Sequence, residues 1–489
     1  MDHTLKEKLF YIFNIFMLVL TVIFTAVIFF ESIFVIRTGE FLEPFPTILC
    51  TLAVCGAFAV LYKLLFRYRE QLLKLEWPLI AALSIIYFLA LFWFGNRLII
   101  VPEYDLDFVQ DSALMIADGD LASAWGRDPY FANFTNQIPL ALLLALFYRI
   151  GFWLGFSDFY IIGNFFNALS ISLAMLLCYK LSRKHFSIEA ALTIYLFLIL
   201  DPIWFLYVSW TSTDTFCLPF LMGGLCLLDE SLGGRLRLGR VFAGFFLIFI
   251  SFTIRATGII LVIAYFIFMA SKYDWKMLLK ALFLAATAFF LCTALYHGIC
   301  RYYGAPYDTD ERLPASHWLM IGSNEESWGE FSSEDYERSL GLSGYEERSR
   351  VSREVFADRI SSMFPMRLIK HCLRKMAETW SSGYCIETTW QSVRAPGRVF
   401  DYAVGAKSAV IQYICQSKRV LLYGCLLFLA AYRLIKGKRE IRFLLTAWLG
   451  AIGFYLLWEA GQRYSLCFVP WMSIAAGEVL CIAFKPAKT

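Results

Sequence analysis

A group of carboxylate residues follows one of the most apolar runs in the chain. Residues 102–120 read PEYDLDFVQDSALMIADGD, and the run before them reads LIAALSIIYFLALFWFGNRLIIV. This segment contains Asp105, Asp107, Asp111, Asp118 and Asp120. A carboxylate at the edge of an apolar environment can act as a general base, because partial burial and neighbouring acids raise its pKa toward the working pH. The segment is therefore the first candidate site for chemistry.

The five aspartates differ in what their spacing predicts. Asp105 and Asp107 are close enough in the sequence to couple electrostatically. If the stretch is helical, Asp107 and Asp111 share one face of the helix. The alternative is a solvated acidic loop, or a helix start whose acids favour the dipole. Asp118 and Asp120 surround a glycine, and this composition is typical of a turn.

The elements that must position these residues are membrane helices. The chain has 489 residues, of which 59% are hydrophobic and 17% charged, whereas soluble proteins have about 45–50% apolar and about 25% charged residues. A helix crosses the hydrocarbon core with roughly 20 apolar residues. Such runs lie near 9–36, 46–66, 77–101, 158–180, 187–207, 213–230, 239–255, 257–271, 277–298, 418–435, 441–458 and 464–484. The sequence therefore predicts an all-α polytopic membrane protein with about twelve transmembrane helices.

One further apolar segment, 138–155, decides the predicted topology. Counting it as a full span would place the basic stretch 179–186 outside the cell, so we interpret it as a juxtamembrane or half-inserted helix. All basic clusters then lie on one side: 63–74, 180–184, 235–240, 272–280, 436–442 and 485–488. The positive-inside rule makes that side cytoplasmic. Both termini are then cytoplasmic, and 102–137 and 300–417 are extracytoplasmic.

Five domains follow from this topology. They are the N-terminal transmembrane helices (1–101), the first outer loop with its juxtamembrane helices (102–157), the central transmembrane bundle (158–299), the extracytoplasmic domain (300–417) and the C-terminal transmembrane helices (418–489). In the fourth domain, Pro365 can begin a helix that runs to Trp380. Its basic residues would form one cationic face, for lipid headgroups or phosphate: Arg367, Lys370, Arg374 and Lys375.

Two arginines at the outer ends of predicted spans are candidate phosphate ligands, because ionisable groups at this depth are costly and usually functional. Arg255 interrupts LIFISFTIRATGIILVIA and could bind phosphate, pair with the acidic site or extend its charge to the headgroups. Arg463 and Tyr464 lie in EAGQRYS, and both are candidates for binding phosphate. Glu459 precedes Arg463 by four residues, so the two could instead pair on one helix face.

Three further residues complete the candidates. Asp214 opens a predicted span in SWTSTDTF, where it could support the outer-loop acids, position an acceptor hydroxyl or cap its helix. His317 and Trp318 are candidate sugar contacts in the large outer loop, although a lone histidine is more often structural. No spacing requires a divalent metal ion, and the thirteen cysteines include no CxxC pair.

Several motifs, in order, resemble those of the GT-C superfamily of integral membrane glycosyltransferases. After the aspartates come DPYFANFTNQIPLALLLALFYRIG, DPIWFLYVSWTSTDTFCLPFLMGGLCLL, IRATGIILVIA, HWLMIGSNEESWGEF, KMAETW and EAGQRYSLCFVPWMSIAAG. More narrowly, the chain resembles the family of dolichyl-phosphate-mannose protein mannosyltransferases and bacterial aminoarabinose transferases, in a form common among Gram-positive bacteria.

The resemblance implies a GT-C fold and an inverting enzyme of the cell membrane with an extracytoplasmic active site. Such an enzyme takes a sugar from a polyprenyl-phosphate carrier and transfers it to a glycan, lipid or protein acceptor, without cofactor, metal or nucleic acid. The family places its catalytic aspartate in the first outer loop, which favours Asp105, with Asp107 second. The family's usual Asp-Glu pair is absent here, so the choice between the two aspartates stays open.

The alternative is a secondary transporter or flippase for a lipid-linked or anionic substrate, in which Arg255 or Arg463 would be a counter-ion. Transporters of this kind commonly show internal repeats and modest loops. No repeat is evident in the sequence, and the two outer segments are long. These features favour chemistry at the outer surface.

Overall fold

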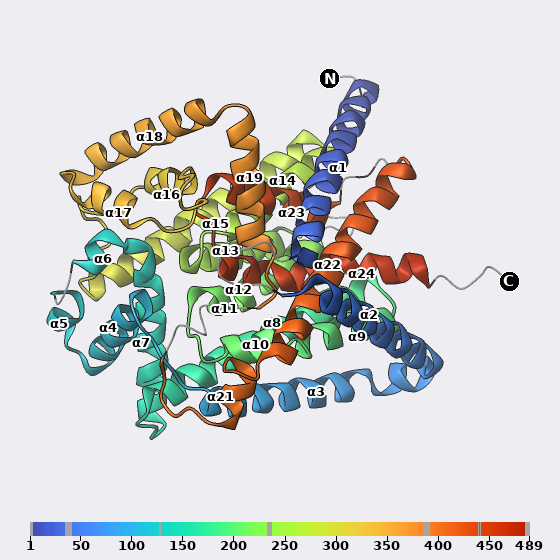
Figure 1. The fold of residues 1–489 in the computed structure, drawn as a ribbon, viewed down its shortest axis with the longest axis horizontal. Coiled ribbons are helices and arrows are strands. Elements are labelled where there is room, and N and C mark those ends of the chain that lie inside the picture. Colours follow the sequence, from blue (N-terminus) through green and yellow to red (C-terminus); the bar gives the residue numbers. More distant parts are fainter. Residues whose placement is uncertain are drawn as a thin grey trace.

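A computed structural model describes residues 3–34, 42–126, 129–231, 237–384, 392–438, 440 and 442–484. Helices make up most of this part of the chain (Figure 1). Its only strands, within those ranges, are β1 (Ile100–Val101) and β2 (Ser392–Val393), which pair antiparallel with Ile100 opposite Val393. This short pair joins the residues just before the predicted first outer segment to residues within the predicted second one.

Long apolar helices confirm that the protein is an all-α integral membrane protein. Eight described helices are long and apolar enough to cross a membrane: α1 (His3–Phe34), α2 (Pro44–Arg67), α3 (Arg69–Arg97), η1 (Thr135–Gln137) with α7 (Ile138–Trp153), α8 (Phe159–His185), α15 (Trp275–Tyr302), α22 (Ala409–Ile435), and η2 (Gln462–Phe468) with α24 (Val469–Ala483). Four shorter apolar helices are α9 (Ile188–Ile199), α13 (Leu238–Ile254), α14 (Gly258–Lys272) and α23 (Phe443–Leu457). The total of about twelve spans stays a prediction.

The segment interpreted as juxtamembrane or half-inserted forms η1 and α7. Together these residues are as long and apolar as the other candidate spans. In the predicted topology α7 is not counted as a transmembrane span. The reason is the position of the basic residues, and not the length or composition of α7. The α7 helix packs along α4 (Asp105–Asp118) in the structure.

Two predicted spans are interrupted near the candidate site. The run 187–207 divides into α9 and α10 (Pro202–Tyr207), because the side chain of Asp201 accepts a hydrogen bond from the Ile203 backbone N–H and Pro202 has no N–H to continue α9. The run 213–230 divides into α11 (Thr213–Phe216) and α12 (Leu218–Ser231). These breaks place short helices and their polar ends inside the bundle.

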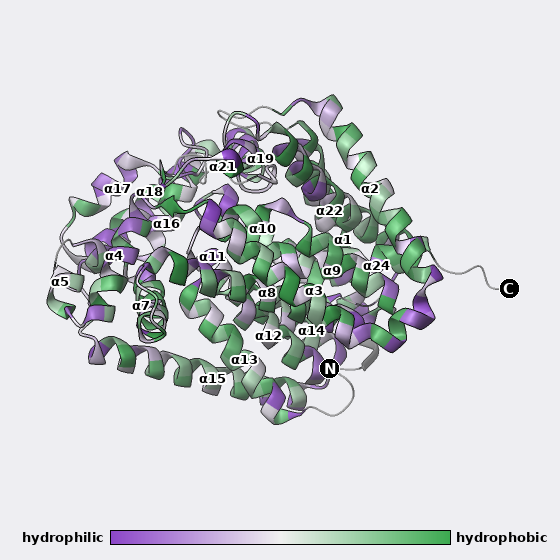
Figure 2. Cartoon of the chain, turned by 90° about the horizontal axis from the view of Figure 1, so that it is seen from below, coloured by the Kyte–Doolittle hydropathy of each residue, from purple (hydrophilic) through white to green (hydrophobic). Residues whose placement is uncertain are grey.

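The segment predicted to be the large outer one contains α16 (Ala315–Gly322), α17 (Ser333–Leu340), α18 (Gly344–Met363), α19 (Met366–Trp380) and α21 (Arg398–Ala403). Hydrophilic residues are frequent on α17 and α18, whereas α2 and α15 are mostly hydrophobic (Figure 2). The predicted helix from Pro365 to Trp380 is confirmed as α19. The prediction that its basic residues form one cationic face is wrong, because Lys375 is fully buried and Arg367 pairs with Glu325.

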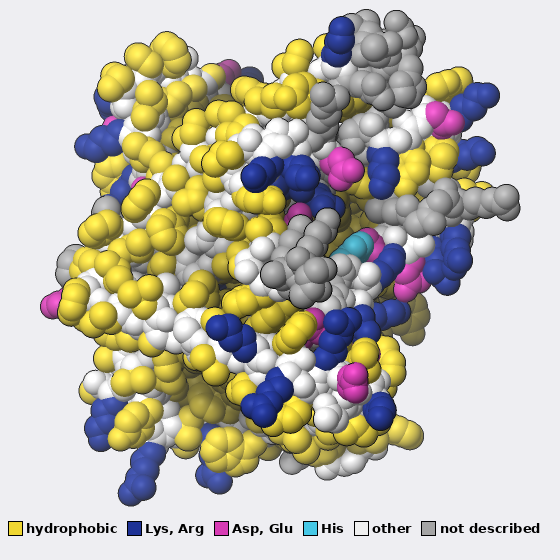
Figure 3. All heavy atoms as spheres, turned by 90° about the vertical axis from the view of Figure 1, so that its right-hand side faces the viewer, with side chains coloured by type: hydrophobic (Ala, Val, Ile, Leu, Met, Phe, Trp, Pro, Cys, Tyr) yellow, Lys and Arg dark blue, Asp and Glu magenta, His cyan; other side chains and the backbone are white. Residues whose placement is uncertain are grey.

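The outer surface of the helices is strongly apolar. In Figure 3, hydrophobic side chains cover much of the face shown, and Lys and Arg side chains gather in groups beside them. Exposed phenylalanine, leucine and isoleucine side chains recur along α1, α2, α3 and α15. Continuous apolar surface of this extent is expected where a protein contacts lipid.

The segment predicted to be the first outer one contains α4, α5 (Leu121–Gly126) and α6 (Tyr130–Asn133), which lie beside α7 (Figure 1). The predicted turn is confirmed: α4 ends at Asp118, and Gly119 adopts φ +90°, which favours glycine. Arg149 of α7 donates to the last carbonyls of α4, those of Ile116 and Ala117. The C-terminal end of α4 is therefore fixed to α7, and its acidic N-terminal end points away from that anchor.

Candidate active site

Asp105 is the first residue of α4, and its charge acts on two of the same buried groups as the charge of Arg463 in η2. Burial raises the pKa of Tyr130 most, the Asp105 carboxylate raises it further, and Arg463 opposes the shift. The same two residues act in opposite directions on the Glu459 carboxyl group. A carboxylate from the first outer segment and an arginine from the last helices therefore share two buried neighbours.

Asp107 and Asp111 face a different part of the protein. Residues two apart in an α-helix are about 200° apart around its axis, so Asp107 projects away from Asp105. The charges of Asp107 and Asp111 both act on the hydroxyl group of Tyr160, at the start of α8. Helix α4 thus confirms that Asp107 and Asp111 share a face, and the face with Arg463 belongs to Asp105.

Glu459 is a buried acid at the centre of this arrangement. It is 7% exposed and lies in the loop between α23 and η2, so it does not pair with Arg463 on one helix face. The Tyr464 hydroxyl donates to Oε2 of Glu459 at 2.8 Å. The guanidinium groups of Arg255 and Arg463 lie 5.0 and 5.5 Å from the centre of the Tyr464 ring. Tyr464 therefore links the buried acid to both arginines.

We expect Glu459 to make stability depend on pH. Burial raises the pKa of Glu459 from 4.5 to about 7, against the opposing effects of Tyr464 and Arg463. Because the folded-state pKa is raised, the favourable contribution is complete below pH 4.5 and is lost as the pH rises to about 7. Replacing Glu459 with Gln should remove a cost of roughly 3 kcal/mol at pH 8 and change little at pH 4.5.

The measurement is the thermal midpoint of unfolding in detergent between pH 4.5 and 8.5. The thermal midpoint of the Glu459→Gln variant should increase relative to that of the wild type as the pH rises. The exposed Glu346 supplies the control, since Glu346→Gln should follow the wild type throughout. Parallel curves for Glu459→Gln and the wild type would contradict the assignment.

Arg255 has an acidic partner that the sequence spacing did not reveal. Its Nη1 lies 2.8 Å from Oδ1 of Asp214, which is 1% exposed, and donates to the Thr213 hydroxyl at 3.1 Å. The interpretation of Asp214 as the helix cap is wrong. Ser212 caps α11, because its hydroxyl accepts from the Asp214 backbone N–H, and it also donates to the Asp214 carboxylate. The Arg255 guanidinium is therefore already neutralised by a buried acid.

The two candidate sugar contacts lie in α16. His317 is 1% exposed, and its Nδ1 is 2.7 Å from the Ser339 hydroxyl. Burial lowers the pKa of His317 to about 4, so the ring is neutral at pH 7. Trp318 is half-buried, with its ring centre 6.2 Å from that of Phe134. His317 thus has a structural position, and Trp318 is the more accessible of the two.

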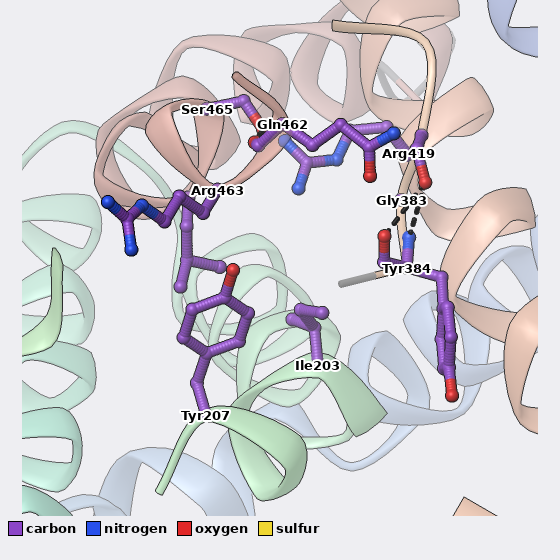
Figure 4. Close-up of a pocket in the computed structure, with 10 residues that line it drawn as sticks. Ile203, Tyr207, Gly383, Tyr384, Arg419, Gln462, Arg463 and Ser465 are labelled. Atoms are coloured by element: carbon purple, nitrogen blue, oxygen red, sulfur yellow. Dashed lines mark hydrogen bonds between the residues drawn. The ribbon is translucent and has the colours of Figure 1, made fainter. Parts of the chain in front are cut away.

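A small polar pocket contains two residues that our sequence reasoning missed. Figure 4 shows Arg419 of α22 and Gln462 of η2 beside each other, with Tyr207 of α10 across the pocket. Arg463 also lines this pocket. Arg419 is 6% and Gln462 4% exposed, and within the described ranges the Nη1 of Arg419 and both side-chain polar atoms of Gln462 make no hydrogen bond. The sequence signal was the pair Lys418-Arg419 at the start of a predicted span.

An apolar groove lies on another side of α10. Pro202, Phe205 and Leu206 line it from α10, whereas Ile203 and Tyr207 of the same helix line the polar pocket. The groove encloses about 540 Å³, and Arg398 of α21 is among its lining residues. One short helix therefore separates a polar pocket with two arginines from an apolar groove, an arrangement suited to an amphipathic ligand.

Comparison with known proteins gives a family for the chain. No curated protein matches it, and no solved structure does. Residues 1–481 match the family described as conserved hypothetical integral membrane protein. Since this match covers nearly all of the chain, and since long apolar helices form the described fold, the protein belongs to this family of integral membrane proteins.

Proposed function

We propose that the protein is an inverting glycosyltransferase of the GT-C type. It would transfer a sugar from a polyprenyl-phosphate donor to a glycan, lipid or protein acceptor outside the cytoplasm. The observation that carries this proposal is the convergence of Asp105 and Arg463 on the same buried groups, Tyr130 and Glu459. A base and a cation at one site are what displacement of a phosphate group from an anomeric carbon requires.

In this mechanism Asp105 accepts the proton of the acceptor hydroxyl group. The hydroxyl oxygen forms a bond to the anomeric carbon as the bond from that carbon to the phosphate oxygen breaks. The polyprenyl phosphate leaves with the electron pair of the broken bond. Asp105 is preferred to Asp107 because it lies on the face of α4 that shares neighbours with Arg463.

The departing phosphate requires positive charge nearby. Arg255 is paired with Asp214, so in the proposed mechanism its role is to hold the Tyr464 ring in place. Arg463 and Arg419 line a common small polar pocket and supply two further guanidinium groups there. Guanidinium groups suit this task because they donate in a planar fork that matches phosphate oxygens.

The apolar groove supports a lipid-linked donor. A polyprenyl chain is a long hydrocarbon, and the groove on α10 is lined by Phe94, Phe205 and Leu206 beside the exposed Arg398. A chain in this groove would keep its phosphate near the polar pocket on the other side of α10. An apolar groove beside a polar pocket would suit one ligand with an apolar tail and an anionic head.

The experiment is a transfer assay with the full chain in liposomes that contain a polyprenyl-phosphate donor with a radiolabelled sugar. We expect the label to move from the lipid carrier to an added membrane-extract acceptor. A flippase would instead move the labelled lipid between leaflets and leave the sugar on its carrier. That second result, with no transfer, would overturn the proposal in favour of transport.

Arg463 should act mainly through donor binding. Replacing Arg463 with Gln removes a charged donor to phosphate, which is worth about 1.5–3 kcal/mol, so the donor KM should rise roughly 10- to 100-fold. The measurement is initial transfer rate against donor concentration. Arg353 on α18 is exposed and bonds only to its own helix among the described contacts, so Arg353→Gln is the control. An unchanged donor KM for Arg463→Gln would leave the phosphate to Arg419.

A further inference from the structure

Two helix ends from distant parts of the chain direct backbone carbonyl groups at one side chain. Lys375 of α19 is 0% exposed. Its Nζ donates to the carbonyl of Gly322, at the end of α16, at 2.6 Å. It also donates to the carbonyls of Leu456 and Trp458, at the end of α23, at 3.0 and 2.7 Å. The lysine therefore joins an outer helix to a helix of the membrane bundle.

The carbonyl groups of Gly322, Leu456 and Trp458 form a carbonyl cradle around the Lys375 nitrogen, and its geometry requires a positive charge. Three carbonyl groups accept from the one Lys375 nitrogen, and only the ammonium form of lysine has three N–H groups. The Gly322 carbonyl has a second partner, the Nε2 of His371 at 3.0 Å. The last carbonyls of a helix also carry partial negative charge, and here two helix ends meet. Burial lowers the pKa of Lys375 to about 7, while the nearby Glu459 opposes that shift. The carbonyl groups replace the water that the buried ammonium group has lost.

The joint around Lys375 is closely packed and leads directly to the candidate site. A Cβ atom on Gly322 would lie 2.3 Å from the carbonyl oxygen of Leu457, so the two backbones meet without a side chain between them. The Ala460 backbone N–H donates to the Gly329 carbonyl at 2.7 Å. These contacts surround Glu459, the buried acid that interacts with Asp105 and Arg463.

We propose that Lys375 acts as a tethered monovalent cation, which clamps the outer helices α16 and α19 to the loop carrying Glu459. It is a positioning residue, since it acts on the site through that loop. Its effect on transfer rests on the proposed function, whereas its role as a bound cation does not. If the side chain is removed, a small free cation with N–H groups should bind in the same carbonyl cradle.

The test is chemical rescue of a Lys375→Ala variant with n-propylammonium. Loss of the side chain should reduce transfer about tenfold or more and lower the thermal midpoint by several degrees, because buried carbonyl groups lose a charged donor. Millimolar n-propylammonium should restore most of the sugar transfer and most of the thermal midpoint. It should leave the wild type unchanged, since its own lysine fills the cradle.

Three comparisons make the result specific. Tetramethylammonium has the same charge but no N–H group, so it should not rescue Lys375→Ala. The Lys375→Met variant fills the space with an apolar chain and should be impaired without rescue. Lys370 is exposed on the same helix, and Lys370→Ala should behave as the wild type.

The proposal is overturned if n-propylammonium and tetramethylammonium have equal effects on Lys375→Ala, or if Lys375→Ala keeps full stability. The thermal measurement needs no substrate. If the wild type shows no sugar transfer, the proposed function fails, but the rescue of the thermal midpoint still decides the role of Lys375.

Discussion

Replacing Asp105 with Asn should abolish most sugar transfer while leaving donor binding intact. The amide keeps the size of the side chain but cannot accept the proton of the acceptor hydroxyl group. General base catalysis contributes about 10²- to 10⁴-fold, so the turnover number should fall by that factor. The donor KM should change by less than about threefold, because the phosphate contacts are assigned to arginines. The measurement is transfer of radiolabelled sugar from the polyprenyl-phosphate donor.

Asp107→Asn is the matched control for this prediction. Asp107 is also exposed and lies only two residues away, but it projects from the other face of α4 toward Tyr160. We expect it to retain at least about a tenth of the activity, since its charge reaches the site only over a distance. If Asp107→Asn is the inactive variant and Asp105→Asn is active, the base has been assigned to the wrong aspartate.

Much of the fold follows directly from the sequence, because lipid permits few alternatives. Only a helix satisfies its own backbone within the hydrocarbon core, so apolar runs of about 20 residues predict helices. The turn after Asp118 and the helix ending at Trp380 followed from local turn and capping preferences, and both are confirmed. The break between α9 and α10 was missed, because the apolar residues around Pro202 outweighed the signal of one proline.

The candidate site was only partly predictable, because its partners come from distant segments. The four-residue spacing of Asp107 and Asp111 correctly predicts that they share a face of α4. Nothing near Arg255 in the sequence identifies Asp214 as its partner, since the contact depends on how α11 packs against α13. The inward direction of Lys375 was missed for a similar reason: a helix with basic residues on both sides does not reveal which of them meets carbonyl groups.

The pair of Asp214 and Arg255 should be the most sensitive point for stability. Asp214 is 1% exposed and Arg255 11% exposed on its side chain. Asp214→Asn leaves the arginine buried without a counter-charge, and breaking a buried ion pair in this way costs about 3–5 kcal/mol. The measurement is the free energy of unfolding in mixed micelles.

The double variant Asp214→Asn/Arg255→Met distinguishes two costs: the loss of the ion pair, and the burial of a charged arginine without its partner. Met removes the positive charge and still fills space beside the Tyr464 ring, so the double variant should be more stable than Asp214→Asn alone. The exposed pair of Glu334 and Arg338 is the control, because Glu334→Gln should cost less than about 1 kcal/mol. If Asp214→Asn costs no more than this control, the pair does not stabilise the fold.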